Sequence, residues 1–144
     1  MSYSQICAAA GKIFGDSYQT IASGTTPTII ISSIRYDNNN IVSGNNFLLQ
    51  IPQNIYIVSS TITCTVTGVT GNLSLRLMWF DGTSHINMGQ QDCYVASGTE
   101  NINITLSCVI KSNENEGQYI YCQLRNNSND TIYLNRYRFS MTIQ

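Results

Sequence analysis

The side chains best suited to chemistry surround the single histidine of the sequence. His85 follows Ser84 directly, and Asp81 and Asp92 lie close to it along the chain. A Ser-His-Asp triad activates its serine only when the three side chains are held in one spatial arrangement. Neighbours in an extended strand point to opposite faces, so Ser84 and His85 diverge. We therefore expect no enzyme and interpret His85 as a surface histidine.

The sequence also offers little that could hold a metal or cofactor. One histidine cannot form a His-based zinc cluster, and no phosphate-binding glycine motif is present. Asp37 and the asparagines at 38–40 could offer oxygens to Ca²⁺, but they include only one carboxylate, so we interpret them as a turn. The five cysteines match no zinc-binding spacing: Cys7, Cys64, Cys93, Cys108 and Cys122. We expect no metal and no cofactor.

The cysteines are interpreted as reduced thiols. The first twenty residues have no charged stretch followed by a long apolar core, so the sequence predicts no secretory signal peptide. Cys64 and Cys108 alternate with inward-facing apolar residues, which is typical of free cysteines buried as small hydrophobic side chains.

The composition predicts an all-β protein and excludes several partners. Charged residues make up 10% of the 144 residues and the net charge is −1, so no basic excess exists to bind nucleic acid. No apolar run is long enough to span a membrane. Isoleucine, threonine, tyrosine and valine favour strands, whereas asparagine, glycine and serine favour turns.

Apolar and polar residues alternate with a period of two along the stretches that position these side chains. Residues 100–110 place Ile102, Ile104 and Leu106 on one face and Asn103 and Thr105 on the other. Eight strands are predicted in this way, at 28–36, 47–51, 54–66, 72–80, 85–95, 100–110, 118–125 and 131–143. Strands of this number and spacing predict a two-sheet antiparallel jelly-roll sandwich.

The N-terminal residues have a different sequence pattern from the strands that follow. Residues 4–14 are consistent with a short helix capped by Ser4, although Gly11 weakens this interpretation and a poorly ordered terminus is the alternative. We divide the chain into an attachment segment at 1–25 and a jelly-roll domain at 26–144.

The order of three motifs resembles the C1q/TNF-like jelly-roll family. In the segment at 47–56, Phe47, Pro52 and Tyr56 occupy places typical of that family, and Asn54 replaces a frequent glycine. The loop at 36–40 resembles the family's preceding loop, and 117–143 resembles its closing pair of strands, with Phe139 at the usual aromatic place. The resemblance covers about residues 20–144.

This resemblance implies a homotrimer built on an aromatic-rich sheet face. Tyr119 and Tyr121 share one face of their strand, opposite Ile120 and Cys122, so that one face can pack the core and the other a neighbouring copy. Each tyrosine has the alternative of being an ordinary core or surface residue. The expected interface residues are Tyr56, Tyr119, Tyr121, Tyr133, Tyr137 and Phe139.

Such heads are common in bacteriophage particles, so the resemblance favours a virion structural protein, either a head fibre or a capsid decoration protein. Its N-terminal segment would attach the trimer to other virion proteins through Tyr3, Ile6, Ile13 and Phe14. The alternative is a receptor- or glycan-binding head of a tail fibre, in which exposed tyrosines, Trp79 and asparagine-rich loops grip a cell-surface sugar. A secreted signalling ligand is a third possibility, which the missing signal peptide disfavours.

Overall fold

The computed structural model describes residues 7–12, 19–31, 34–37, 40–49 and 54–143. Within them the chain forms eleven strands: β1 (Cys7–Lys12), β2 (Gln19–Ile21), β3 (Ile34–Asp37), β4 (Val42–Ser43), β5 (Asn46–Leu48), β6 (Ile55–Thr65), β7 (Gly71–Phe80), β8 (His85–Val95), β9 (Asn101–Lys111), β10 (Tyr119–Ser128) and β11 (Ile132–Ile143). No helix in the part of the chain described is long and apolar enough to cross a membrane.

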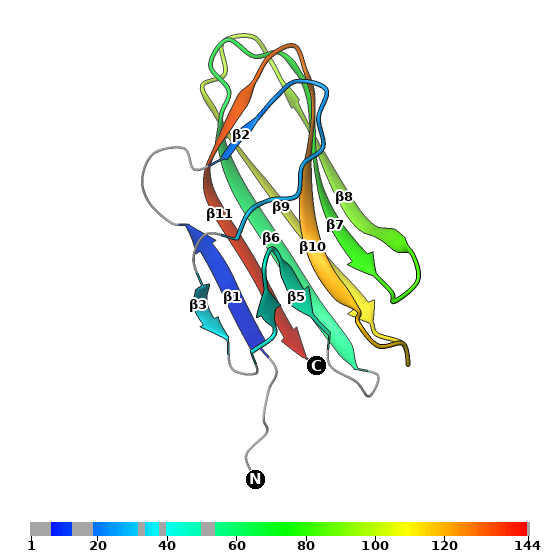
Figure 1. Ribbon diagram of the computed structural model, residues 1–144. Helices are drawn as coiled ribbons and strands as arrows, with labels where there is room; N and C mark the ends of the chain where they lie inside the picture. The colour runs from blue at the N-terminus through cyan, green and yellow to red at the C-terminus, as the bar shows by residue number, and fades with distance from the viewer. Residues whose placement is uncertain (1–6, 13–18, 32–33, 38–39, 50–53, 144) are drawn as a thin grey trace.

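The strands form two antiparallel sheets that face each other. Sheet A has the order β3-β1-β11-β6-β9, with β2 pairing the first part of β11, and sheet B has the order β4-β5-β10-β7-β8. Figure 1 shows the long strands of the two sheets running side by side as a sandwich. The prediction of an all-β, two-sheet jelly-roll sandwich is confirmed.

The predicted alternation places the core between the sheets. Along β6, Val58, Ile62 and Cys64 are fully buried, while Thr61 and Thr63 point away from the core. β10 does the same with Ile120, Cys122 and Leu124, all with no exposed surface. The inner faces of both sheets therefore supply the hydrophobic core, and the outer faces stay available for partners.

The helix predicted over residues 4–14 is wrong in its described part. Residues 7–12 form β1, which pairs with β11 from Cys7↔Thr142 to Lys12↔Tyr137 and with β3 on its other side. A helix this short is marginal on its own, whereas a strand between two others pairs its backbone on both edges. The remaining residues of that helix, 4–6 and 13–14, lie outside the described residues.

The run at 28–36 is a strand only at its end. Ile34–Asp37 forms β3, while Thr28 meets sheet B through one isolated bridge to Gln123. Side-chain acceptors take the place of a ladder here: Gln19 Oε1 accepts the N–H of Ile30, and Asn45 Oδ1 accepts that of Ile31. Apolar periodicity cannot reveal such side-chain pairing, which is why the predicted strand was too long.

Part of the predicted attachment segment belongs to the sandwich. β1 and β2 both pair with β11, and Ile21 is fully buried in the core. Beyond β2, the N–H of Gly24 donates to the carbonyl of Asn126, and the N–H of Asn126 donates to that of Thr25. The division of the chain at residue 25 stays a prediction.

Candidate functional site

Three of the expected interface residues lie in the core instead. Tyr56 and Phe139 have no exposed surface and Tyr137 is 2% exposed. The ring of Phe139 stacks on Phe47 across the sandwich, with centroids 4.1 Å apart. The alternation of residues 131–143 predicts one shared face for Tyr133, Tyr137 and Phe139. Tyr137 and Phe139 do share a face, which points inward, but the register shift between Leu134 and Arg136 places Tyr133 on the outer face. Tyr56, Tyr137 and Phe139 therefore offer no surface to a second copy, and the prediction that they form a trimer interface is wrong.

The other three expected interface residues lie on opposite sides of the sandwich. Tyr133 is 43% exposed on β11, where its buried neighbours Ile132 and Leu134 point into the core. Tyr119 and Tyr121 project from β10, on the outer face of sheet B. One flat contact with a neighbouring copy cannot cover Tyr133 and this tyrosine pair together.

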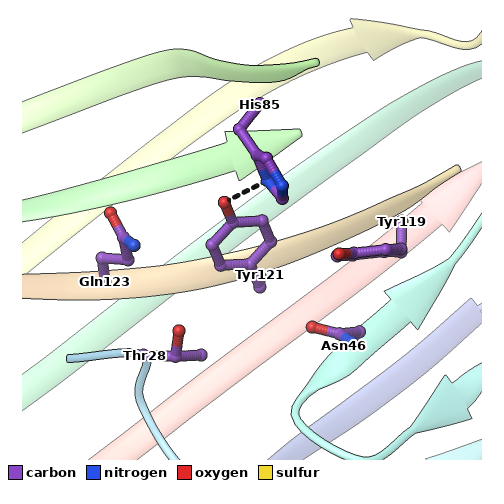
Figure 2. A pocket seen from close by; sticks show the side chains of 6 residues that line it. All are labelled: Thr28, Asn46, His85, Tyr119, Tyr121 and Gln123. Carbon is purple, nitrogen blue, oxygen red and sulfur yellow. Dashed lines mark hydrogen bonds between the residues drawn. The ribbon is translucent and has the colours of Figure 1, made fainter. Parts of the chain in front are cut away.

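A shallow hollow surrounds the tyrosine pair on the outer face of sheet B. It has a volume of 230 Å³ and is lined by Thr28, Asn46, His85, Tyr119, Tyr121 and Gln123. Figure 2 shows Tyr121 in the middle, with Tyr119 and Gln123 to either side of it and His85 across from Thr28 and Asn46. We take this hollow as the candidate functional site.

Strand register assembles the site from segments that are distant in sequence. β10 alternates Tyr119, Tyr121 and Gln123 outward, and Phe80 on β7 pairs with Tyr119 on one side and His85 on the other. The turn between β7 and β8 is fixed by Asp81, whose Oδ1 accepts the N–H groups of Ser84 and Thr83. These bonds lower the pKa of Asp81 and so favour the ionised carboxylate that closes the turn.

The aromatic side chains hold one another in place. Tyr121 Oη lies 2.6 Å from His85 Nδ1, a hydrogen bond in which either atom can donate. Phe80 contacts both His85 and Tyr119, at centroid distances of 4.8 and 5.1 Å. Burial raises the pKa of Tyr121, and the neighbouring Tyr119 raises it further, so the phenol stays protonated at neutral pH. The site is thus ordered before any ligand arrives.

The residues first considered for catalysis and metal binding have other partners. His85 bonds to Tyr121, whereas Asp92 accepts hydrogen bonds from Ser74 and Gln90. These bonds lower the pKa of Asp92. In the described ranges no three of the metal-ligating residue types His, Cys, Asp and Glu gather as a metal site.

The carboxylate of Asp37 already accepts hydrogen bonds from backbone N–H groups. Its two carboxylate oxygens accept the N–H groups of Ile41 and Val42. The interpretation of this segment as a turn is therefore supported by its hydrogen bonds, which use the only carboxylate that the stretch could offer a cation.

Trp79 does not take part in the site. It packs against the core, and its indole N–H donates to Gln118 Oε1 at 3.2 Å. Trp79 is half-buried on the inner face of β7, and the expectation that it grips a sugar stays a prediction. The expected attachment residues Tyr3, Ile6, Ile13 and Phe14 lie outside the described residues.

Half of the residues that line the hollow were predictable from the sequence as one strand face. The alternation at 118–125 correctly predicted that Tyr119, Tyr121 and Gln123 share a face. His85 was expected at the surface but not beside Tyr121, and Thr28 and Asn46 were not singled out. Their place depends on cross-strand register and on the single bridge at Thr28, neither of which leaves a local signal.

Solved structures, and not sequences, show what this chain is similar to. No protein-family model and no characterised protein matches the chain by sequence. Among solved structures, murine APRIL shares 8% identity, with a TM-score of 0.71 over 97% of this chain and 99% of its own. The globular domain of zebrafish complement 1qA protein shares 10% identity, with a TM-score of 0.60 over 96% of each chain.

A viral protein is also among the similar structures. The vertex protein P5 of PRD1 shares 15% identity with this chain, with a TM-score of 0.61 over 96% of each. The structural comparisons, together with the two antiparallel sheets, show that the chain has a C1q/TNF-like jelly-roll fold.

Proposed function

We propose that this chain is a structural protein of a virus particle, a bacteriophage head fibre or capsid decoration protein that forms a homotrimeric jelly-roll head. The observation that carries the proposal is the similarity to the vertex protein P5 of PRD1 over nearly the whole length of both chains. The activity is mechanical, and the fold supplies a rigid unit with one face for self-association and another for solvent.

The outer face of sheet A is the surface we assign to self-association. Of the seven large hydrophobic side chains exposed among the described residues, four lie on this face: Ile55, Ile57, Val109 and Tyr133. Ile57 and Val109 are direct partners across β6 and β9, and Val109 is 61% exposed. Ile55, Ile57 and Val109 form a patch at one end of the face, whereas Tyr133 lies at the other end, opposite Thr65. Covering the patch removes apolar surface from water, which favours association.

Removing water from the polar part of the same face costs little free energy. Ser59 and Ser107 bond to each other at 2.9 Å, and Thr61 and Thr105 at 3.2 Å. Hydroxyl groups that already satisfy one another lose little when a neighbouring copy excludes water. The exposed arginines of β11, Arg136 and Arg138, lie beside this ladder and would pair with loop carboxylates of a neighbouring copy.

Attachment to the particle is proposed for the N-terminal segment, through Tyr3, Ile6, Ile13 and Phe14. The partners are then two further copies of the chain and other virion proteins, and the place of the protein is the virion. Neither nucleic acid nor a membrane is proposed as a partner.

A second candidate function is a receptor- or glycan-binding head of a tail fibre. The observation that favours it is the ordered hollow around Tyr119 and Tyr121, on the sandwich face opposite the one assigned to self-association. The two candidates are compatible when the head both decorates the particle and contacts a cell.

The virion proposal is tested on particles. Antibodies raised against the purified chain are applied to purified particles of the virus that encodes it, and gold labelling is followed by electron microscopy. We expect labels on intact particles and the chain among their proteins by mass spectrometry. A chain that is abundant in infected cells but missing from washed particles would contradict the proposal.

A further inference from the structure

We infer that the hollow on the outer face of sheet B is a carbohydrate site that holds one neutral sugar ring. The inference rests on the proposed function only for the source of the sugar, which is the surface of a host cell. Three properties of the hollow lead to this ligand class: the chemistry of its lining, its lack of formal charge and its size.

The lining combines aromatic rings with groups that both donate and accept hydrogen bonds. Thr28 and the two tyrosines bring hydroxyl groups, and Asn46 and Gln123 bring side-chain amides. A sugar ring has the matching pattern, since its hydroxyl groups donate and accept around a ring whose C–H groups are apolar. Pockets that select small molecules commonly pair such apolar surface with a few fixed polar groups.

Tyr119 is the ring that a sugar can cover. It is part-exposed, whereas Tyr121 is only 7% exposed and forms the floor. Phe80 stacks on Tyr119 at an interplanar angle of 30°, and so fixes its orientation. The negative face of an aromatic ring attracts the slightly positive C–H groups of a sugar. Because the ring is already held, little side-chain freedom is lost when the ligand binds.

The charge pattern selects a neutral ligand. No Asp, Glu, Lys or Arg lines the hollow. Two cations lie just outside the lining on the same face. Arg76 is the cross-strand partner of Gln123, and its Nε donates to Gln90, while Arg125 follows Gln123 two residues along β10. Within the lining itself, a phosphate or sulfate group would meet no lysine or arginine, and an ammonium group would meet no carboxylate.

The volume limits the ligand to about one ring. At 230 Å³ the hollow is smaller than the roughly 300–1,000 Å³ of sites that enclose drug-sized molecules. The rest of a glycan must therefore extend into solvent. A site this shallow predicts a Kd of roughly 1 mM per ring. Three copies on one head would raise the affinity for a glycan-covered surface by avidity.

The test measures the binding of simple sugars to the purified full-length chain. Saturation-transfer difference NMR is recorded with the methyl glycosides of glucose, galactose, mannose and N-acetylglucosamine, and with glucose 6-phosphate as the anionic probe. We expect at least one neutral glycoside to bind with a millimolar Kd, and its ring C–H protons to show the strongest saturation transfer. We expect glucose 6-phosphate to bind no more tightly than that glycoside.

Two variants locate the site and one serves as a matched control. Tyr119→Ala should raise the Kd for the glycoside about tenfold, because it removes the ring on which the sugar stacks. Gln123→Ala should also raise this Kd, because it removes an amide that hydrogen-bonds to the sugar. Tyr94→Ala removes an exposed tyrosine at the other end of the same sheet face and should leave binding unchanged.

Three outcomes overturn the inference. The first is wild-type protein that binds none of the four neutral glycosides. The second is equal binding by wild type and Tyr119→Ala. The third is a Tyr119→Ala chain that is folded but has a smaller solution mass than wild type, because Tyr119 would then lie at the interface that the sequence predicted.

The inference and the virion proposal fail separately. Sugar binding by the purified chain, lost in Tyr119→Ala, supports the inference even if the chain is missing from virus particles. Labelled particles together with a chain that binds no sugar would support the virion proposal alone.

Discussion

At the residue scale, the side-chain amide of Asn126 joins two elements of the fold through four hydrogen bonds. It is fully buried, and its amide N–H groups donate to the carbonyls of Ile21 and Asp130 at 3.0 and 2.9 Å. Its Oδ1 accepts from the N–H and the hydroxyl of Ser128. One side chain thereby links β2 to the end of β10.

We predict that Asn126→Ala lowers the free energy of unfolding by about 3 kcal/mol, because it leaves several buried donors and acceptors without a partner. Asn127→Ala is the matched control, since its side chain is exposed, and should change stability by less than about 0.5 kcal/mol. Urea denaturation of both variants checks this. Equal losses would contradict the role assigned to the network.

The buried cysteines make the free energy of unfolding depend on pH, because burial shifts the pKa of their thiols. Burial raises the pKa of Cys64 and of Cys122 to about 12, from an ordinary value of 9.0. Cys93 near Cys64 adds to the first shift, while hydrogen bonds from Ser60 and Tyr137 oppose the second. Among the described cysteines, Cys64, Cys93, Cys108 and Cys122 are free thiols.

Because the unfolded thiols ionise near pH 9 and the folded ones near 12, rising pH favours the unfolded chain across that window. Below pH 9 the thiols' contribution is fully present and constant. We expect the free energy of unfolding, measured in urea between pH 8 and 11, to fall, and to fall less steeply in Cys122→Ala. Identical slopes for the variant and wild type would contradict this assignment.

At the element scale, one close approach between strands requires glycine. Gly71 begins β7 with a φ of 127°, opposite Ser128 on β10. A Cβ at this position would lie 2.7 Å from the Cα of Ser128, a backbone atom that cannot move alone. Gly98 also has a positive φ, of 88°, but a Cβ there would meet open space.

We predict that Gly71→Ala costs at least about 3 kcal/mol of stability, the sum of backbone strain and overlap. Gly98→Ala carries the strain alone and should cost about 1 kcal/mol. Thermal and urea unfolding of the pair separates the two effects. A Gly71→Ala chain as stable as the Gly98→Ala chain would show that β7 and β10 can move apart freely.

Strands were predictable from the sequence where apolar and polar residues alternate along the chain. Alternation identified the inward faces of β6 and β9, because only one face of each is apolar. On β10 both faces are largely apolar, so alternation identified only which residues share a face. It failed at Cys7–Lys12, where small residues carry no period and pairing with β11 and β3 decides in favour of a strand. It also failed at Thr28, whose environment is set by one bridge to Gln123.

At the scale of the whole molecule, each sheet presents an outer face of different character. Sheet A shows Ile55, Ile57 and Val109 beside a hydroxyl ladder, and sheet B shows the hollow around Tyr121. The aromatic residues that were predicted to form one interface lie on both outer faces and in the core. Alternation reveals which residues share a strand face, but where both faces of a strand are largely apolar, as on β10, it cannot tell which of them meets the other sheet.

We predict that Val109→Arg dissociates the trimer, because a charge placed in a buried contact has no partner there. Tyr94→Arg adds the same charge to an exposed position on sheet B and should leave the trimer intact. Circular dichroism establishes that both variants are folded, and light scattering gives their masses. A trimeric Val109→Arg would show that this part of sheet A lies outside the interface.

The central claim is that the chain works as a trimeric jelly-roll head. Light scattering coupled to size exclusion, on the intact chain at micromolar concentration, tests it most directly. The account predicts a mass of three times 16.0 kDa, about 48 kDa, for wild type. A mass of 16.0 kDa, that of a single chain, would contradict it.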